Sequence, residues 1–212
     1  MRLTIFGATG GVGRLAVEQA LAAGHHVTAY ARSASKLTIQ HPNLTVVEGQ
    51  LSDADAIRLA VAGSDAVVSA LGPTLARGAT GTPLTEGTYL IVAAMKAEGV
   101  RRYVGMATPS IRDPHDGRSL TGLILPVMAR VFLPNALREL RGMTDAVQAS
   151  DLDWTIGRFS RPTDGPATGT VRSGFLGQDK VGMAITRANI AAWLLEQVEG
   201  RTYIKAAPVI SN

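Results

Sequence analysis

The chain has 212 residues, of which 46% are hydrophobic and 18% are charged, and its formal net charge is +4. This composition is typical of globular proteins and excludes intrinsic disorder, and the length suits one α/β domain. Because the sequence contains no cysteine, disulfides, thiolate metal sites and a cysteine nucleophile are excluded.

Charge and terminal sequence also bear on partners and location. The four histidines lack metal-ligand spacing, so we expect no metal site. Basic residues are dispersed and aromatic residues are few, which argues against nucleic acid as a partner. The amino terminus has no long apolar segment and no small-residue cleavage site, so we expect a cytoplasmic protein without a membrane partner. A small-molecule substrate and a monomer or homodimer remain as the expected partners and assembly.

Apolar patterning predicts alternating strands and helices in the first half of the chain. Residues 3–6 form a short apolar strand that stops at a glycine, and helical spacing follows from residue 12 to Gly24. Residues 27–31 and 44–47 are predicted to be the next two strands. Each strand is therefore followed by a turn or a crossover.

The same alternation continues through the middle of the chain. Ser52 is expected to cap a helix at residues 53–62, and residues 65–71 are predicted to be a fourth strand. A helix at residues 85–98 and a strand at 101–107 follow. Near the end, residues 153–158, a helix at 187–199 and a strand at 202–207 should extend and cover the same sheet.

Residues 120–133, "LTGLILPVMARVFL", are the most apolar stretch, but they are too short to span a bilayer. One interpretation is a helix packed on the sheet. The other is an apolar lid over a substrate pocket or a dimer contact, because a helix that is apolar on nearly every side must bury more than one face.

The alternation predicts an α/β fold of the Rossmann type, with a doubly wound, mainly parallel sheet. No boundary interrupts it, so we expect one nucleotide-binding domain over residues 1–212. Its carboxyl-terminal elements should complete the sheet and the substrate side.

The motif "GATGGVG" at residues 7–13 lies between the first strand and the first helix. Backbone N–H groups at a helix start attract phosphate, and glycines permit a tight turn, a close approach and close packing of the helix on the strand. The motif predicts a dinucleotide site at Gly7, Thr9, Gly10, Gly11, Val12 and Gly13. A second "GATG" at residues 78–81 is not expected to bind, since it follows no strand and precedes Pro83 instead of a helix.

The segment "YARSASKL" after the second strand carries Arg32, Ser33 and Lys36 and has no carboxylate where NAD-binding chains usually have one. Arginine can grip a 2′-phosphate through its planar fork. The segment therefore favours NADP(H) over NAD. The alternative is that Arg32 and Lys36 are solvated loop charges.

Several motifs together resemble the atypical short-chain dehydrogenase/reductase group, in particular NmrA-like proteins and the biliverdin reductase B (flavin reductase) type. They are "GATGGVG", "YARSASKL", "DAVVSALG", "GVRRYVGMAT", "SDLDWTIGRFSRPTDGPATG" and "AITRANIAAWLLEQ". The resemblance spans nearly the whole chain.

The resemblance implies further contacts with the cofactor. Leu51 would lie near the adenine, although Gln50 stands where the family commonly has an aspartate. The remaining implied contacts are Ala70, Leu71, Gly72, Met106, Ala107, Thr108, Phe159, Ser160 and Arg161.

The sequence departs from the catalytic residue types of this group. No tyrosine is followed four residues later by a lysine, and this pair is the usual proton donor of short-chain dehydrogenases. Thr108 and Arg161 occupy the places of a serine and a histidine in the flavin reductase type. Thr108 would orient a substrate carbonyl and Arg161 would hold an anionic substrate. The alternative is that both serve the loops or a cofactor phosphate.

These features predict an NADPH-dependent reductase of a flavin, quinone or similar conjugated acceptor, which needs no strong acid. The alternative is a non-catalytic NADP(H)-sensing regulator of the NmrA-like kind. An epimerase is a third and weaker interpretation, because no base is evident.

Overall fold

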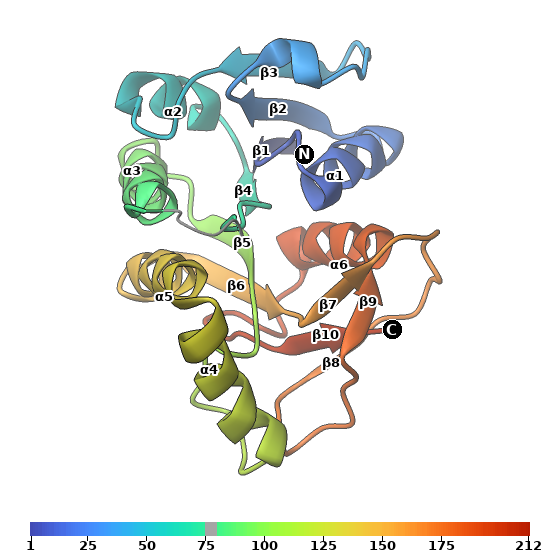
Figure 1. The fold of residues 1–212 in the computed structure, drawn as a ribbon. Coiled ribbons are helices and arrows are strands. Elements are labelled where there is room, and N and C mark those ends of the chain that lie inside the picture. Colours follow the sequence, from blue (N-terminus) through green and yellow to red (C-terminus); the bar gives the residue numbers. More distant parts are fainter. Residues whose placement is uncertain (75–79) are drawn as a thin grey trace.

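A computed structural model describes residues 1–74 and 80–212 and shows one central sheet with helices on both faces (Figure 1). The strand order is β3-β2-β1-β4-β5-β6-β10-β8. Neighbours from β3 to β10 run parallel, and β8 alone pairs antiparallel with β10. The first six strands follow the order of a doubly wound Rossmann sheet. The predicted fold class is confirmed.

The parallel strands of the main sheet carry short, mostly apolar segments that end at its carboxyl edge, whereas β8 runs in the opposite direction. The strands of the main sheet are β1 (Arg2–Phe6), β2 (His26–Ala31), β3 (Leu44–Glu48), β4 (Ala66–Ser69), β5 (Arg102–Ala107), β6 (Asp153–Arg158), β8 (Arg172–Gly174) and β10 (Val209–Ser211). A separate pair is formed by β7 (Arg161–Thr163) and β9 (Ala184–Thr186).

Two layers of helices cover this sheet (Figure 1). The helices are α1 (Gly11–Ala22), α2 (Ala54–Val61), α3 (Pro83–Ala97), α4 (Leu120–Phe132), α5 (Pro134–Gln148) and α6 (Arg187–Glu199), with a 3₁₀ turn η1 (Ala34–Lys36). α1 packs against α6 on one face, while α2, α3 and α5 form the other layer.

Alternation along the strands divides the core into two clusters. In β4, Val68 joins the cluster under α1 and α6, whereas Val67 joins the cluster under α2, α3 and α5. Ile5 and Phe6 of β1 divide in the same way. Successive side chains of a strand point to opposite faces, so a sheet buried on both sides needs apolar residues at every position.

Two predicted helix starts are wrong by one or two residues. Asp53, not Ser52, caps α2, and its carboxylate accepts the N–H of Ala56. α3 begins at Pro83, because proline suits the first helical position, where no N–H is needed. The second "GATG" therefore does precede a helix, contrary to expectation. Part of it lies outside the described residues.

The strand predicted at residues 202–207 is wrong. This segment is a series of turns, with a single bridge between Thr155 and Ala206. Lys205 has φ 57°, a left-handed conformation that interrupts an extended chain. The sheet is extended instead by β10, whose Val209 pairs with Arg158 of β6.

Residues 120–133 form a helix, but the interpretation of a helix packed on the sheet is wrong. In α4 only Gly122 is buried, and Leu120 is 77% exposed. The helix contacts α5, a helix that the sequence analysis did not predict. Among the described residues no single helix is long and apolar enough to cross a membrane. Only α4 and α5 taken together reach the required length and apolar composition, and the two helices are bent by 119° relative to each other.

Candidate functional site

The turn between β1 and α1 requires glycine at two positions. Gly7 has φ 74°, and a Cβ there would lie 2.7 Å from the carbonyl oxygen of Ala70. A Cβ on Gly13 would lie 2.0 Å from the carbonyl oxygen of Gly7. A side chain on Gly7 would collide with the backbone at the end of β4, and one on Gly13 would force the helix away from the turn that follows β1. The glycines thus fix the start of α1 at the carboxyl edge of the sheet.

The first turn of α1 is open toward solvent. Its N-cap, Gly10, has no side chain to accept an N–H, and the first turn contains no acidic residue. The first N–H groups of a helix lack partners inside the helix and carry a partial positive charge. A Cβ on Gly10 would meet only the Gly7 carbonyl oxygen within 4 Å, at 3.3 Å. The turn therefore leaves space for an anion beside unpaired donors.

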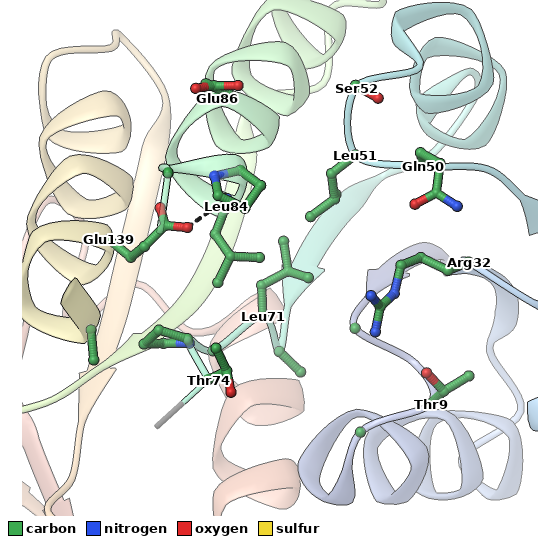
Figure 2. A pocket seen from close by; sticks show the side chains of 18 of the residues that line it. Thr9, Arg32, Gln50, Leu51, Ser52, Leu71, Thr74, Leu84, Glu86 and Glu139 are labelled. Carbon is green, nitrogen blue, oxygen red and sulfur yellow. Dashed lines mark hydrogen bonds between the residues drawn. The ribbon is translucent and has the colours of Figure 1, made fainter. Parts of the chain in front are cut away.

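A pocket of about 530 Å³ runs along this edge from the glycine turn (Figure 2). Its floor is formed where β1 and β4 end, and Arg32 and Gln50 lie at the end of β2 and beyond β3. The residues predicted from the sequence that line it are Gly7, Thr9, Gly10, Arg32, Leu51, Ala70, Leu71 and Gly72.

The other predicted residues do not line this pocket. They are Gly11, Val12, Gly13, Ser33, Lys36, Met106, Ala107, Thr108, Phe159, Ser160 and Arg161. Some of them adjoin its end, because the Cε of Met106 lies 3.4 Å from where a Cβ on Gly72 would be. The N–H of Phe159 donates to the carbonyl of Ala107 at 3.1 Å, so the ends of β5 and β6 continue this edge.

Arg32 is exposed at the pocket, and Figure 2 shows its guanidinium directed inward. The expectation that no carboxylate lies near its loop is wrong. Glu48, at the end of β3, accepts the N–H of Ala34 through Oε2 at 2.8 Å. Sequence distance concealed this contact, since neighbouring parallel strands end side by side.

The far end of the pocket was missed by sequence analysis. Glu139 of α5 is 7% exposed, and its carboxylate accepts the N–H groups of Leu84 and Thr85 at 3.0 and 2.9 Å (Figure 2). It also accepts the Thr85 hydroxyl at 2.8 Å. A carboxylate at a helix start is stabilised by the donors and the dipole there. Glu139 thus caps α3 and holds the pocket wall.

Among the described residues at this edge, the phenols are not activated. Tyr30 lines the pocket and donates to the carbonyl of Gln50 at 2.7 Å. Burial, reinforced by the charge of Asp53, raises the pKa of Tyr30 to about 12. Burial also raises the pKa of Tyr103 in β5 to about 12. Neither phenol ionises near neutral pH.

The two predicted catalytic residues lie on neighbouring segments. Thr108 follows β5 and shares a 2.6 Å hydrogen bond between its hydroxyl and that of Ser110. Arg161 begins β7 and is exposed, and its backbone N–H donates to Met183. The structure therefore places both beyond the pocket, near the ends of β5 and β6.

A second arginine near the glycine turn was not found from the sequence. A Cβ on Gly11 would lie 3.0 Å from the Cδ of Arg187, the first residue of α6. Arg187 pairs with Asp164 through a contact of 2.6 Å between Nη1 and Oδ1. This pairing brings the loop after β7 and the start of α6 to the first turn of α1.

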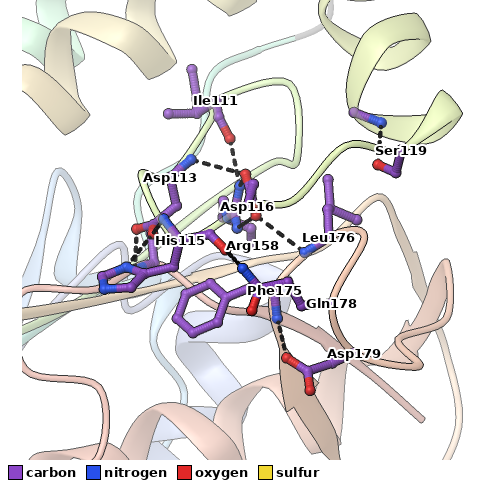
Figure 3. A network of polar contacts seen from close by, with 12 residues as sticks. Ile111, Asp113, His115, Asp116, Ser119, Arg158, Phe175, Leu176, Gln178 and Asp179 are labelled. Carbon is purple, nitrogen blue, oxygen red and sulfur yellow. Dashed lines mark hydrogen bonds and ion pairs between the residues drawn. The ribbon is translucent and has the colours of Figure 1, made fainter.

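A buried ion pair holds the end of β6 (Figure 3). Arg158 and Asp116 form two hydrogen bonds of 2.7 Å, and their side chains are 0% and 3% exposed. Asp116 also accepts the N–H groups of Asp113 and Leu176, while Arg158 donates to the carbonyl of Ile111. The pair thereby joins β6 to the loop before α4 and to the segment after β8.

Comparisons with known proteins agree with this geometry. A family model described as NAD(P)H-binding matches residues 7–201. A 3-beta-hydroxysteroid dehydrogenase of Mycolicibacterium neoaurum is 34% identical over 120 residues, which are 52% of this chain and 32% of that protein. The match thus spans about a third of the length of that relative.

Solved structures share the fold over the whole chain. ChuY, described as an anaerobillin reductase from Escherichia coli O157:H7, has a TM-score of 0.79 and 23% sequence identity. The match covers 100% of this chain and 97% of the ChuY chain. A short-chain dehydrogenase/reductase from Veillonella parvula, solved in complex with NADP, has a TM-score of 0.79 and 18% identity, with coverages of 100% and 94%. At these identities the likeness establishes the fold.

The open turn predicts that Gly10→Ala weakens dinucleotide binding much more than it lowers stability. The new methyl group would project into space that a phosphate needs, whereas its only close contact is the Gly7 carbonyl oxygen. We expect dinucleotide binding to weaken at least tenfold, measured by calorimetry, because an anion loses its approach to the N–H groups. The melting temperature should fall by only a few degrees. Binding equal to that of the parent protein would contradict this assignment of the turn.

The buried pair predicts a pH dependence of stability. Burial alone would raise the pKa of Asp116, but the hydrogen bonds and charge of Arg158, with two backbone N–H groups, lower it overall. A pKa lowered by folding stabilises the protein above the usual aspartate pKa of about 4, and this contribution is lost as the pH falls from there through the lower pKa of the folded state.

Asp116→Asn leaves the Arg158 charge buried without its partner. We expect the free energy of unfolding at neutral pH to fall by about 3–5 kcal/mol and its acid dependence to become shallower, measured by urea titration at several pH values. Asp151→Asn is the control, because Asp151 belongs to an exposed ion pair with Arg101 and should change stability by less than about 1 kcal/mol. Similar losses in both variants would rule out the special role of the buried pair.

Proposed function

The chain belongs to the NAD(P)H-binding family, and from this membership we propose that it is an NADPH-dependent reductase of a flavin, a quinone or a similar conjugated small molecule. The observation that carries the proposal is the pocket that begins at the uncapped first turn of α1 and runs to Leu71 and Gly72. A dinucleotide is long and carries a diphosphate, so it needs both the donors and the length of this edge.

The glycine turn fits the cofactor. The N–H groups of the first turn of α1, at Gly11, Val12 and Gly13, would hold the diphosphate, and Thr9 offers a hydroxyl beside them. Arg187, which adjoins Gly11 and pairs with the exposed Asp164, would bring a guanidinium near the same phosphates. Leu51 would contact the adenine, and Ala70 and Leu71 would line the ribose.

Arg32 supports NADPH in preference to NADH. Its guanidinium lines the pocket and makes no ion pair within residues 1–74 and 80–212. A guanidinium binds phosphate through two parallel hydrogen bonds. Ser33 and Lys36 would assist from the same loop, although neither lines the pocket itself. The Veillonella parvula relative, which was solved with NADP, supports the same choice.

The choice of acceptor follows from the missing proton donor. When bound, NADPH supplies a hydride, and the protein must then position the acceptor and exclude competing reactions. With no tyrosine–lysine pair and with Tyr30 and Tyr103 held protonated, a delocalised acceptor that takes its proton from water is the best match.

Residues at the ends of β5 and β6 would form the substrate side. Met106, Ala107 and Phe159 would flank the nicotinamide, because they continue the edge beyond Gly72. Thr108 would orient an acceptor oxygen through its hydroxyl, which Ser110 holds in place. Arg161 would attract an anionic group, since its side chain is exposed beside this edge.

Catalysis is favoured over a purely regulatory role. One structural relative named above is described as a reductase, and the relative from Mycolicibacterium neoaurum is described as a dehydrogenase. A regulator would bind the dinucleotide without needing room for an acceptor. Turnover decides between these functions directly.

The deciding experiment follows NADPH absorbance in the presence of FMN, a water-soluble quinone or a redox dye. We expect oxidation of NADPH with at least one acceptor, and Thr108→Val should lower kcat while leaving the KM for NADPH unchanged. Calorimetry with NADP runs in parallel. Tight binding of NADP without turnover of any acceptor would support the regulator instead.

Arg32→Ala tests the choice of cofactor. Loss of a charged hydrogen bond to the 2′-phosphate should raise the KM for NADPH by roughly 10- to 100-fold, while the KM for NADH should change little. Arg14→Ala is the matched control, because Arg14 is an exposed arginine on α1 that does not line the pocket. Equal losses with both cofactors would reject the role of Arg32 at the 2′-phosphate.

A further inference from the structure

One side of α4 presents a continuous apolar stripe to solvent. Its members recur at helical spacing, so they share one face of the helix. They are Leu123, Ile124, Val127, Met128, Val131 and Phe132, and their exposed fractions lie between 48% and 68%. Exposed apolar side chains elsewhere, such as Leu59 of α2 and Tyr89 of α3, are single on their helices. A contiguous apolar surface of this kind marks an interaction site.

The rest of the protein holds α4 by its opposite side. Ser119 caps the helix by accepting the N–H of Gly122, which is buried, and a Cβ there would lie 3.8 Å from Leu176. Ala129 packs against the core cluster under α2, α3 and α5. The helix is thus attached through its small residues, and this attachment leaves the large apolar ones outward.

Exposed positive charge flanks the stripe. Of the arginines in residues 112–141, Arg118 lies just before α4 and Arg130 lies in its last turn, and both side chains are exposed, while an exposed carboxylate, Asp145, follows this range on α5. The acidic residues of the same range have their carboxylates turned inward, since Asp113 and Asp116 accept N–H groups in the Arg158 cluster (Figure 3) and Glu139 caps α3.

The neighbouring turn does not reverse this balance. Gly177 lies against Gly117 and Arg118, and the turn that follows carries Asp179 and Lys180. Asp179 is engaged with the N–H of Phe175 at 2.8 Å, and Lys180 offsets its charge. The surface around α4 therefore combines a large apolar face with a net positive border.

We propose that α4 docks this protein peripherally on an anionic lipid bilayer. An amphipathic helix can lie in the plane of a membrane with its apolar face at the boundary between headgroups and acyl chains. Arg118 precedes α4 and Arg130 lies at the edge of the stripe, so both would meet lipid phosphates. The contact needs one helix face and no spanning segment. It is independent of the proposed reductase activity, and it replaces the expectation of no membrane partner.

A second copy of the chain fits this surface less well. A symmetric contact through the stripe would bring together two copies of α4, each flanked by Arg118 and Arg130, and residues 112–133 offer no exposed carboxylate to pair with them. Like charges placed against each other disfavour an association. Anionic headgroups supply the missing negative charge.

The test is co-sedimentation of the full chain with vesicles. We expect binding to phosphatidylglycerol-rich vesicles, weaker binding to pure phosphatidylcholine vesicles, and release as the salt concentration rises. Failure to bind either kind of vesicle would overturn the proposal. Equal binding to both kinds that is insensitive to salt would also overturn it.

Two matched pairs of variants assign the contact to α4. Leu123→Gln should weaken vesicle binding about tenfold or more, whereas Leu59→Gln, which alters a similarly exposed leucine of α2, should not. Arg130→Gln should weaken binding roughly fivefold, whereas Lys96→Gln, in the last turn of α3, should not. All four positions are exposed, so circular dichroism should show folded proteins. Equal effects within either pair would contradict docking through α4.

Sedimentation equilibrium without lipid tests whether a second copy of the chain covers the apolar stripe instead. We expect a parent protein whose oligomeric state does not change with Leu123→Gln. A dimer that Leu123→Gln dissociates would assign the stripe to a second copy and reject the membrane surface.

Discussion

The contact between Gly13 and the Gly7 carbonyl is the constraint on which the site depends. It lets α1 start directly above the end of β1, and a single methyl group on Gly13 would separate them. The uncapped N–H groups of α1 then face the pocket that runs along the carboxyl edge. Parallel strands all end at this edge, so one tight turn determines where phosphate meets the residues contributed by β2, β4 and β5.

A second constraint acts at the other end of the sheet. The Arg158–Asp116 pair ties β6 to the loop before α4 and to the segment after β8. Burying both charges is costly unless the polar atoms around them are used. Beyond the two bonds within the pair, three backbone contacts contribute, because Asp116 accepts two N–H groups and Arg158 donates to the Ile111 carbonyl, while the Nε of Arg158 has no partner among the described residues. The carboxylates of Asp113 and Asp116 are engaged in this cluster. Within residues 1–74 and 80–212, Arg118 and Arg130 form no ion pair, which gives the exposed helix its positive border.

The substrate side departs from the usual short-chain dehydrogenase pattern. Tyr30 and Tyr103 are held protonated by burial, and the carboxylate of Glu139 is engaged by the start of α3. Glu86 also lines the pocket, where it is exposed and accepts the Thr82 hydroxyl. Under the proposed function the bound cofactor would supply the hydride, and the acceptor would take its proton from water.

The sequence alone predicted a doubly wound, mainly parallel sheet, because periodicity and glycine placement are local properties, whereas the strand order came from the structure. Gly7, Gly10 and Arg32, which the sequence predicts as cofactor contacts, line the pocket. Only the tertiary structure brought Glu48 to the Arg32 loop, Arg187 to Gly11 and Glu139 to the far wall, since these contacts join residues distant in the sequence. The tertiary structure also decided that the apolar face of α4 is exposed. Composition shows that a helix is apolar, but only packing decides whether the rest of the protein covers that surface.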